Sequence, residues 1–350
     1  MTHNIHGTFV SEKINKIRWR PDFMNDSHYF ITGSWDNDQN SIKLWDFQEN
    51  EEDAEVYPFL VTEFCHKGDV TEIKFLNGDF FVTSSSLGSV YLMKISSEHG
   101  IEPLIENKIS WEGIHKFPNE EISPCTAFAT NDNDIVSVGE DGTINLLNSQ
   151  NQSIFRKFNN ADSCSINCVT FLKHSEILTG NLRGQLKIFD IRASKNEPTT
   201  IFMLSGDQVA PLCLQHHPTQ RHLIMAGDEE GSITIWDLRQ NAYPVNLLDA
   251  HEGSISEIHF HPDHPNQLFT CSGAGDVWHW SPKSGGMATA GLTAENVWLA
   301  SETIKNKLDV FTLMPKLHKP INSVDVNRNK VICGCDNEAM YLINGINIFK

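Results

Sequence analysis

The residues with the strongest potential for chemistry are five histidines in the second half of the chain. His259, His261 and His264 follow one another closely, and His216 and His217 precede them. Alternate residues of a strand share a face, so His259 and His261 could bind a metal together. No carboxylate or thiol set accompanies them, and each His-Pro pair is typical of a turn after a strand. We therefore expect turns here and no metal.

Two further motifs imitate functional sites. Cys271-Ser-Gly-Ala-Gly275 is the nearest match to a nucleophile elbow, but it fits a strand end and a turn. Asp36-Asn-Asp38-Gln-Asn40 resembles the start of a calcium loop, yet Ser41 replaces the glycine and Phe47 the bidentate glutamate. There is no phosphate-binding glycine loop and no convergent His and carboxylate set for a hydrolase. The sequence predicts a non-enzymatic protein with no catalytic residues, no cofactor and no small-molecule substrate.

Composition narrows the class of protein. The 350 residues are 39% hydrophobic and 21% charged, which is typical of a soluble globular protein with a large core. The net charge of -18 disfavours direct binding to nucleic acid and to anionic membranes. No apolar stretch is long enough to insert into a membrane, no secretory signal is recognisable, and the scattered cysteines fit free thiols. We expect a cytosolic or nuclear protein.

A repeat positions these motifs. An apolar-x-x-apolar-x-aromatic pattern, typical of a buried strand, recurs at Ile14/Ile17/Trp19, Val70/Ile73/Phe75, Ile166/Val169/Phe171, Ile255/Ile258/Phe260 and, more loosely, Ile321/Val324/Val326. A second strand, a tight turn and a third strand follow, and the third strands carry the large apolar anchors Trp45, Met93, Leu147, Phe189, Trp236, Trp280 and Ile343. Seven four-stranded units can hide their apolar faces only in a closed ring. We therefore predict an all-β, seven-bladed β-propeller that occupies residues 1–350 as a single domain.

Two connections are longer than the others. Ser96 to Pro124 is predicted to contain an outer strand near Asn107 to Trp111. Residues 282–306 form a divergent insertion after the third strand of blade 6, with a short helix predicted near residues 295–305 and a strand near residues 308–313. Long loops of a propeller are common places for partner contacts.

The third strands resemble the WD-repeat family through Leu44-Trp-Asp46, Ile188-Phe-Asp190 and Ile235-Trp-Asp237. The resemblance implies that an N-terminal strand closes the ring, and Thr8 to Ser11 is the segment available for it. The family's hydrogen-bonded set of His, Ser/Thr, Asp and Trp is expected to be incomplete in every blade. Leu87 and Ala274, for example, stand where the turn Asp belongs.

Within that family the chain resembles the WD-repeat nucleoporins of the Y-shaped outer-ring complex of the nuclear pore. The resemblance departs at the Gly273-Ala-Gly275 turn and in the 282–306 insertion. It rests on Phe9-Val-Ser11, Arg18-Trp-Arg-Pro21, Gly33-Ser-Trp-Asp-Asn37, Val138 to Leu146, Asn160-Ala-Asp-Ser163, Gly184 to Ile188, Asn196-Glu-Pro198, Leu204-Ser-Gly-Asp207, His261-Pro262, Leu268 to Ser272 and Trp278-His-Trp280.

This resemblance implies a scaffold subunit whose partners are other Y-complex nucleoporins, in particular an α-helical subunit of the short arm. It also implies a role in mRNA export and protein transport, a location at the nuclear envelope, and recruitment to kinetochores in mitosis. The alternative is a substrate receptor of a cullin ubiquitin ligase, because Trp236-Asp-Leu-Arg239 and Phe189-Asp-Ile-Arg192 resemble the Trp-Asp-x-Arg box of such receptors.

Candidate contact residues lie near the loops that enter the innermost strands and near the middle turns, where several are expected only to brace the blades. Trp298 is a further candidate inside the insertion, although packing against the propeller is its expected fate. The acidic run Glu49 to Glu55 is expected to be a solvated loop. The candidates are Arg18, Trp35, Asp36, His66, Asp141, Asp162, Arg183, Asp207 and His251.

Overall fold

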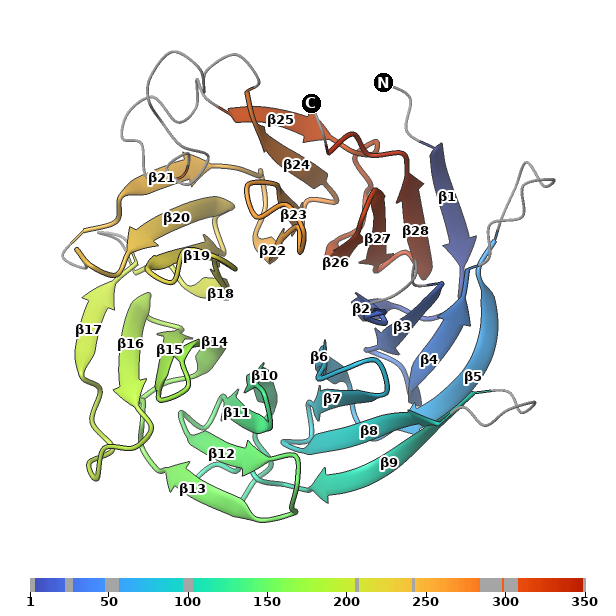
Figure 1. The fold of residues 1–350 in the computed structure, drawn as a ribbon. Coiled ribbons are helices and arrows are strands. Elements are labelled where there is room, and N and C mark those ends of the chain that lie inside the picture. Colours follow the sequence, from blue (N-terminus) through green and yellow to red (C-terminus); the bar gives the residue numbers. More distant parts are fainter. Residues whose placement is uncertain are drawn as a thin grey trace.

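The computed structural model describes residues 4–22, 28–47, 57–96, 103–204, 208–240, 243–283, 298 and 308–348. These residues form β-strands, turns and loops, without any helix. The strands make seven four-stranded antiparallel sheets arranged around a central channel (Figure 1). The prediction of a seven-bladed propeller is confirmed.

Each of the first six blades uses four consecutive strands, ordered from the channel to the rim. Blade 1 contains β2 (Ile14–Trp19), β3 (Tyr29–Ser34), β4 (Asn40–Asp46) and β5 (Phe59–His66). Blade 2 contains β6 (Val70–Phe75), β7 (Phe80–Ser85), β8 (Val90–Ser96) and β9 (Leu104–Trp111). Blade 3 contains β10 (Cys125–Asn131), β11 (Asp134–Gly139), β12 (Ile144–Asn148) and β13 (Ile154–Phe158).

Blades 4 to 6 repeat the arrangement, and the predicted anchors lie on the third strands throughout. Blade 4 contains β14 (Ile166–Lys173), β15 (Glu176–Asn181), β16 (Gln185–Asp190) and β17 (Thr200–Met203). Blade 5 contains β18 (Pro211–His216), β19 (Leu223–Asp228), β20 (Ser232–Asp237) and β21 (Asn246–Asp249). Blade 6 contains β22 (Ile255–Phe260), β23 (Leu268–Ser272), β24 (Val277–Pro282) and β25 (Leu308–Thr312).

Blade 7 closes the ring by joining the two ends of the chain. It contains β26 (Ile321–Asn327), β27 (Lys330–Cys335), β28 (Ala339–Asn344) and, at the rim, β1 (Asn4–Phe9). The register of β1 against β28 runs from Asn4 opposite Asn344 to Phe9 opposite Ala339. An N-terminal strand therefore closes the ring as predicted, but it is Asn4–Phe9 rather than Thr8 to Ser11. Ser11 has a φ of 60°, which turns the chain toward β2.

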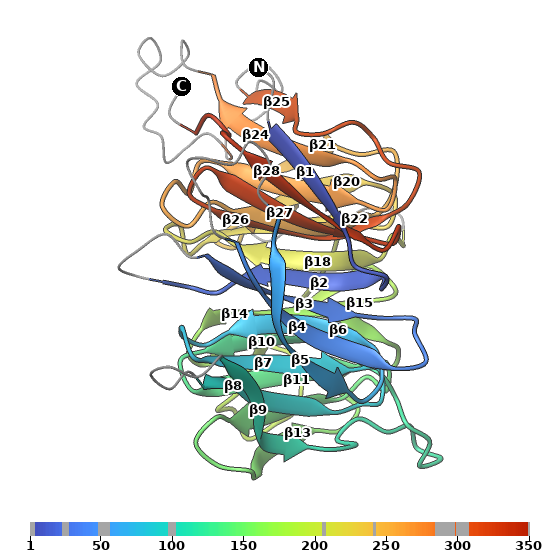
Figure 2. The same cartoon turned by 90° about the vertical axis from the view of Figure 1, so that its right-hand side faces the viewer.

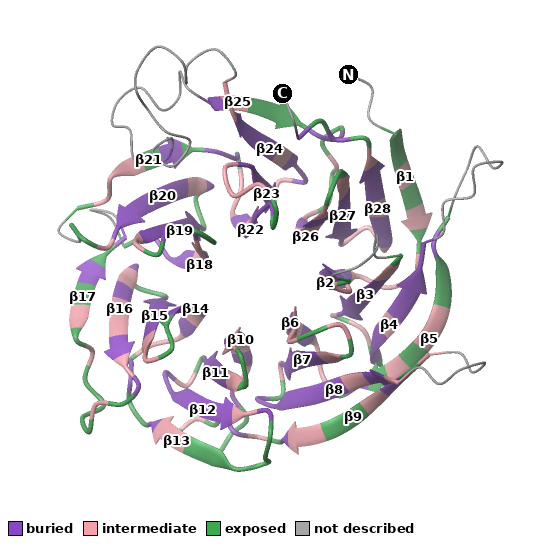
Figure 3. Ribbon diagram, in the orientation of Figure 1, coloured by how far each residue is buried: buried purple, intermediate pink, exposed green. Residues whose placement is uncertain are grey.

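The core consists of apolar layers between neighbouring blades. Ile42 of β4, for example, packs in one cluster with Ile73 of β6, and Met225 of β19 packs with Ile258 of β22. Burial is greatest on the inner three strands, whereas the rim strands expose side chains (Figure 3). A fully buried Val, Leu, Ile or Phe contributes about 1.5–3 kcal/mol, so these layers hold the blades together.

A repeated backbone irregularity links the blades around the channel. Each of the seven innermost strands has a register shift between its first and third residues, which marks a bulge at the second residue. At five junctions the side chain of this bulged residue donates a hydrogen bond to the first residue's carbonyl oxygen in the next blade. The bonds are Asn15 to Val70 (2.6 Å), Thr71 to Cys125 (2.6 Å), Thr126 to Ile166, Asn167 to Pro211 (3.4 Å) and Asn322 to Ile14 (2.9 Å).

Two junctions of the described ring lack this bond: Leu212, between blades 5 and 6, has no polar side chain at the bulged position, and Ser256, between blades 6 and 7, does not make it. The neighbouring Cys213 thiol lies 3.9 Å from the Ile255 carbonyl oxygen, which is a weaker interaction. All eight cysteines of the chain are free.

Candidate protein-interaction face

The disc has two faces, seen from the rim in Figure 2. We call the upper face the one formed by the loops that lead into the innermost strands and by the turns between the second and third strands of each blade. The lower face carries the remaining connections. The candidate residues of the predicted contact region belong to the upper face or to the channel beneath it.

The upper face is acidic. Its described loops and turns contain sixteen acidic and six basic residues, an excess of ten negative charges (16 − 6 = 10). Glu140 and Glu230 stand exposed in the middle turns of blades 3 and 5. The acids are Glu12, Asp36, Asp38, Asp69, Glu112, Glu120, Glu121, Glu140, Asp141, Asp162, Glu229, Glu230, Glu252, Asp276, Asp336 and Glu338, and the bases are Lys13, Lys67, Lys116, Arg183, Lys316 and Lys319.

Exposed apolar side chains interrupt this acidic surface. Leu87 and Leu182 in the middle turns of blades 2 and 4 are 42% and 54% exposed, and Ile122 between blades 2 and 3 is 52% exposed. The loop carrying Ile122 lies tightly on blade 2, since a Cβ on Gly88 would approach the Ser123 carbonyl oxygen to 2.5 Å. Leu87 and Ile122 therefore flank one close backbone contact and present apolar surface on the same side.

Trp35 and Asp36 connect blade 1 to its neighbours. The Trp35 indole N–H donates to Asp336 of blade 7 at 2.8 Å. Asp36 pairs with Lys13, and its backbone N–H donates to the Asp69 carboxylate at 2.9 Å. Trp35 is half-buried and braces the closure of the ring, whereas Asp36 is exposed.

The candidate histidines His66 and His251 are buried and stabilise the blades through hydrogen bonds. His66 Nε2 lies 2.9 Å from Thr83 Oγ1 in blade 2, and burial lowers the pKa of His66. In blade 6, Thr270 Oγ1 lies 2.7 Å from His251 Nε2 and accepts from the Trp280 indole at 3.0 Å. Burial, aided by the Lys316 charge, lowers the pKa of His251 to about 4.

The expectation that every blade lacks part of the family's polar set is wrong for blade 6. All four residue types are present, because the turn acid is Asp276, two positions after Ala274. Its carboxylate stays 3.9 Å from His251 Nδ1, beyond hydrogen-bond distance. The set is therefore complete in composition, while one of its hydrogen bonds is missing.

Blade 3 contains a hydrogen-bonded set of His, Asp and Ser side chains that sequence reasoning missed. His115 is fully buried, with Nδ1 3.1 Å from the Asp141 carboxylate and Nε2 2.9 Å from Ser137 Oγ. Burial acts to raise the pKa of Asp141, but its hydrogen bonds with His115 and Thr143 outweigh burial and lower it. The signal was obscured because His115 precedes β10 by ten residues, inside a long connection.

In blade 4 an acid replaces the histidine of this set. Asp162 is buried, pairs with Lys187 at 2.8 Å and accepts from the Asn181 amide at 2.9 Å. In blade 1, Glu12 likewise pairs with a lysine of the third strand, Lys43, at 3.0 Å, although Glu12 lies two residues before the innermost strand and Asp162 lies four before its own. Asp162 is thus a brace, whereas Arg183 in the adjacent middle turn is exposed on the upper face.

Arg18 lies in the channel wall and joins four blades. Its guanidinium donates to both carboxylate oxygens of Glu257 in blade 6 at 2.7 and 3.0 Å, and to Glu72 in blade 2 at 2.8 Å. It also donates to Ser323 Oγ in blade 7 at 2.7 Å. Burial opposes ionisation of Arg18 and Glu257, but the ion pair outweighs it, raising the pKa of Arg18 and lowering that of Glu257. Lys16 adds a 2.5 Å contact to Glu257.

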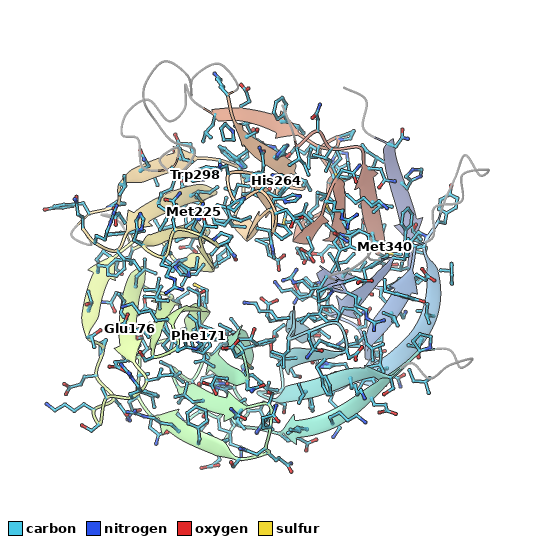
Figure 4. The ribbon with its side chains drawn as sticks, in the orientation of Figure 1. Phe171, Glu176, Met225, His264, Trp298 and Met340 are labelled. Carbon is cyan, nitrogen blue, oxygen red and sulfur yellow. The ribbon has the colours of Figure 1, made fainter. Side chains whose placement is uncertain are left out.

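Two candidates are not available on the upper face as described. Asp207 and the acidic run 49–55 lie outside the described residues. Of the helix predicted near residues 295–305, only Trp298 is described. The Trp298 side chain is completely buried in the cluster between blades 5 and 6, 6.2 Å from the Phe260 ring, and Asn246 donates to its carbonyl oxygen at 3.2 Å (Figure 4). The expected packing of Trp298 against the propeller is confirmed.

Relatives of known name match almost the whole chain. "Nucleoporin Nup43" of Homo sapiens is 37% identical over 97% of this chain and 98% of its own length, and the Mus musculus protein is 35% identical over the same shares. The chain belongs to the Nup43 family of nucleoporins. "Nuclear pore complex protein nup43" of Dictyostelium discoideum is 22% identical over 96% of this chain and 97% of its own.

A family model supports the fold independently. The model described as "Nucleolar protein 10-like, N-terminal domain", a β-propeller domain, matches residues 105–312, from β9 to β25. The chain thus also belongs to this propeller family over more than half its length. WD repeats, the propeller and the nucleoporin family were all predicted from the sequence, and all are confirmed.

The histidines of two His-Pro pairs, His217 and His261, stabilise turns of this Nup43-family chain. His261 lies beyond the end of β22, so it does not share a strand face with His259 as expected. Instead, its Nδ1 accepts the backbone N–H groups of Asp263 and His264, both at 3.1 Å, and His217 accepts that of Gln220 in the same way. Burial lowers the pKa of His217 to about 4 and lowers that of His261.

No group of three or more metal-binding side chains gathers within the described ranges. Nor do these ranges contain a helix with the length and apolarity needed to span a bilayer.

Proposed function

We propose that the protein is a non-enzymatic scaffold subunit of the nuclear pore, acting in the Y-shaped outer-ring complex. The observation that carries this proposal is the match to Nup43 proteins over nearly the full length of both chains. A rigid closed ring with two large faces suits a subunit that holds other proteins in place. In this proposal residues 1–350 act as one domain, and residues 282–306 are a divergent insertion after the third strand of blade 6.

We propose further that the upper face binds the partner, an α-helical scaffold subunit of the short arm. Exposed Leu87, Ile122 and Leu182 offer apolar contacts, and the surrounding acids favour a partner surface rich in Lys and Arg. Asp36 and Arg183 are the exposed candidates for direct contact. The other described candidates on this face and in the channel, Trp35, His66, Asp141, Asp162, His251 and Arg18, maintain the shape that presents them.

The same assembly would give the protein its roles in mRNA export, protein transport and kinetochore recruitment during mitosis. These roles follow from membership of the complex and need no catalytic group, no cofactor, no small-molecule substrate and no membrane insertion. The acidic upper face also argues against direct contact with nucleic acid phosphates.

Affinity purification of the tagged full chain from cell extract, followed by mass spectrometry, tests this proposal. We expect other subunits of the outer-ring complex among the bound proteins, with recovery that falls as salt rises. Recovery of a cullin adaptor without nuclear pore proteins would instead support the receptor alternative, for which Arg239 of the Trp-Asp-x-Arg box is 61% exposed and bound to Asp237.

A further inference from the structure

The central channel contains a cavity of about 100 Å³ with an excess of positive charge. Three cations, Lys16, Arg18 and Lys74, and two carboxylates, Glu72 and Glu257, line it, leaving one net positive charge among these five side chains (3 − 2 = 1). This excess is local, because the chain as a whole carries a net charge of -18.

The two carboxylates are already engaged. Glu257 accepts from Lys16 and Arg18, and also from Ser323 Oγ at 2.9 Å and the Val324 N–H at 3.1 Å. Glu72 accepts from Arg18 at 2.8 Å and lies 3.8 Å from Lys16. Arg18 and Lys16 therefore have their counter-charges within the wall.

Lys74 is the cation of these three that has no such counter-charge in the wall. It is the fifth residue of β6, two positions after Glu72, so both side chains lie on the channel side of the strand. Across the described chain it has no hydrogen bond and no ion pair within 4 Å. Burial and repulsion from Arg18 and Lys16 lower the pKa of Lys74, although Glu72 acts to raise it.

We propose that this cavity binds a small free oxyanion, a phosphate or a carboxylate, with Lys74 as its principal ligand. An oxyanion would supply the missing counter-charge and accept a charge-assisted hydrogen bond from the ammonium group. Gln215 of blade 5 also lines the cavity and can donate its amide N–H groups. A compact anion fits the cavity volume of about 100 Å³.

Titration of the full-length protein with inorganic phosphate and, separately, with sodium acetate tests the proposal, with sodium chloride at matched ionic strength as reference. We expect saturable binding of at least one oxyanion and a rise in Tm beyond the chloride effect. Lys74→Met should weaken binding at least about tenfold. The control Lys173→Met, at an exposed lysine on the lower face, should bind as the unaltered protein does.

Lys74→Met is expected to fold, because it replaces an unpaired, half-buried cation with an apolar side chain of similar length. Should it not fold, NMR of labelled lysine side chains in the unaltered protein decides the question, since bound oxyanion must raise the pKa of Lys74. Saturable binding that Lys74→Met leaves intact, absence of saturable binding of both oxyanions, or a Lys74 pKa that they do not shift would each overturn the proposal.

Discussion

Charged residues gather in two places in this protein, the channel wall and the upper face, and they are organised differently. In the wall, Arg18, Lys16, Glu72 and Glu257 are mostly buried and bind one another across three blades. On the upper face, Glu140, Glu230 and Arg183 are exposed on turns. Charges that satisfy one another hold the ring together, whereas charges left to solvent are available to a partner. Sequence position alone did not separate the two groups.

The largest expected effect is the loss of Arg18. Arg18→Met leaves Glu257 buried with only part of its counter-charge and should lower the free energy of unfolding by about 3–5 kcal/mol. Denaturant unfolding monitored by tryptophan fluorescence measures this change. The double variant Arg18→Met/Glu257→Gln should recover part of the loss, because the unpaired charge is removed. A single variant within about 0.5 kcal/mol of the unaltered protein would show that the network does not hold the ring.

Protonation of each buried histidine should have the next largest effect. His217 and His251 have folded-state pKa values lowered from 6.5 to about 4, so the unfolded chain binds more protons between these values. Stability is thus fully present above pH 6.5 and falls as pH decreases toward 4, by on the order of 3 kcal/mol for each histidine. Unfolding measured from pH 7.5 to 4.5 tests this, and His217→Gln should reduce the slope. A flat profile across this range would contradict the burial argument.

The bulge hydrogen bonds should have a smaller effect. Thr71→Val removes the bond to Cys125 in a side chain of similar shape and should cost about 1 kcal/mol. Leu212→Asn places a donor at the junction between blades 5 and 6. We therefore expect it to lower Tm less than a polar substitution of Leu212 that cannot donate. Tm measurements on Thr71→Val, Leu212→Asn and Leu212→Asp make the comparison, because Asp has the shape of Asn but cannot donate. Equal losses for the two Leu212 variants would show that the asparagine forms no bond between the blades.

The exposed charges of the upper face, unlike Asp141 and Asp162, should have almost no effect on stability. Glu140→Lys and Glu230→Lys alter exposed turn residues, so we expect the free energy of unfolding to remain within about 0.5 kcal/mol. The lower-face variants Asp263→Lys and Glu197→Lys serve as matched controls, since these acids are exposed too. A loss of more than about 2 kcal/mol in the upper-face variants would mean that these charges brace the ring, as those of the channel wall do.

Much of the fold could be predicted because apolar spacing reflects burial. Residues such as Ile17 and Trp45 must fill the layers between blades, so their pattern repeats along the chain. The channel network could not be predicted, since Arg18 and Glu257 lie 239 residues apart and meet only after the ring has closed. The ion pairs of Glu12 and Asp162 were equally hidden, because each acid pairs with a lysine on a different strand.

The most direct test of the account compares the two faces in partner binding. Tagged full-length protein, the double variant Glu140→Lys/Glu230→Lys and the double variant Asp263→Lys/Glu197→Lys are expressed at equal levels, and the bound nuclear pore subunits are quantified by mass spectrometry. Because like charges then oppose a basic partner, we expect the upper-face variant to lose about tenfold or more of the recovered subunits and the lower-face variant to match the unaltered protein. Full recovery with the upper-face variant, together with loss in the lower-face variant, would contradict the assignment of the upper face as the docking surface.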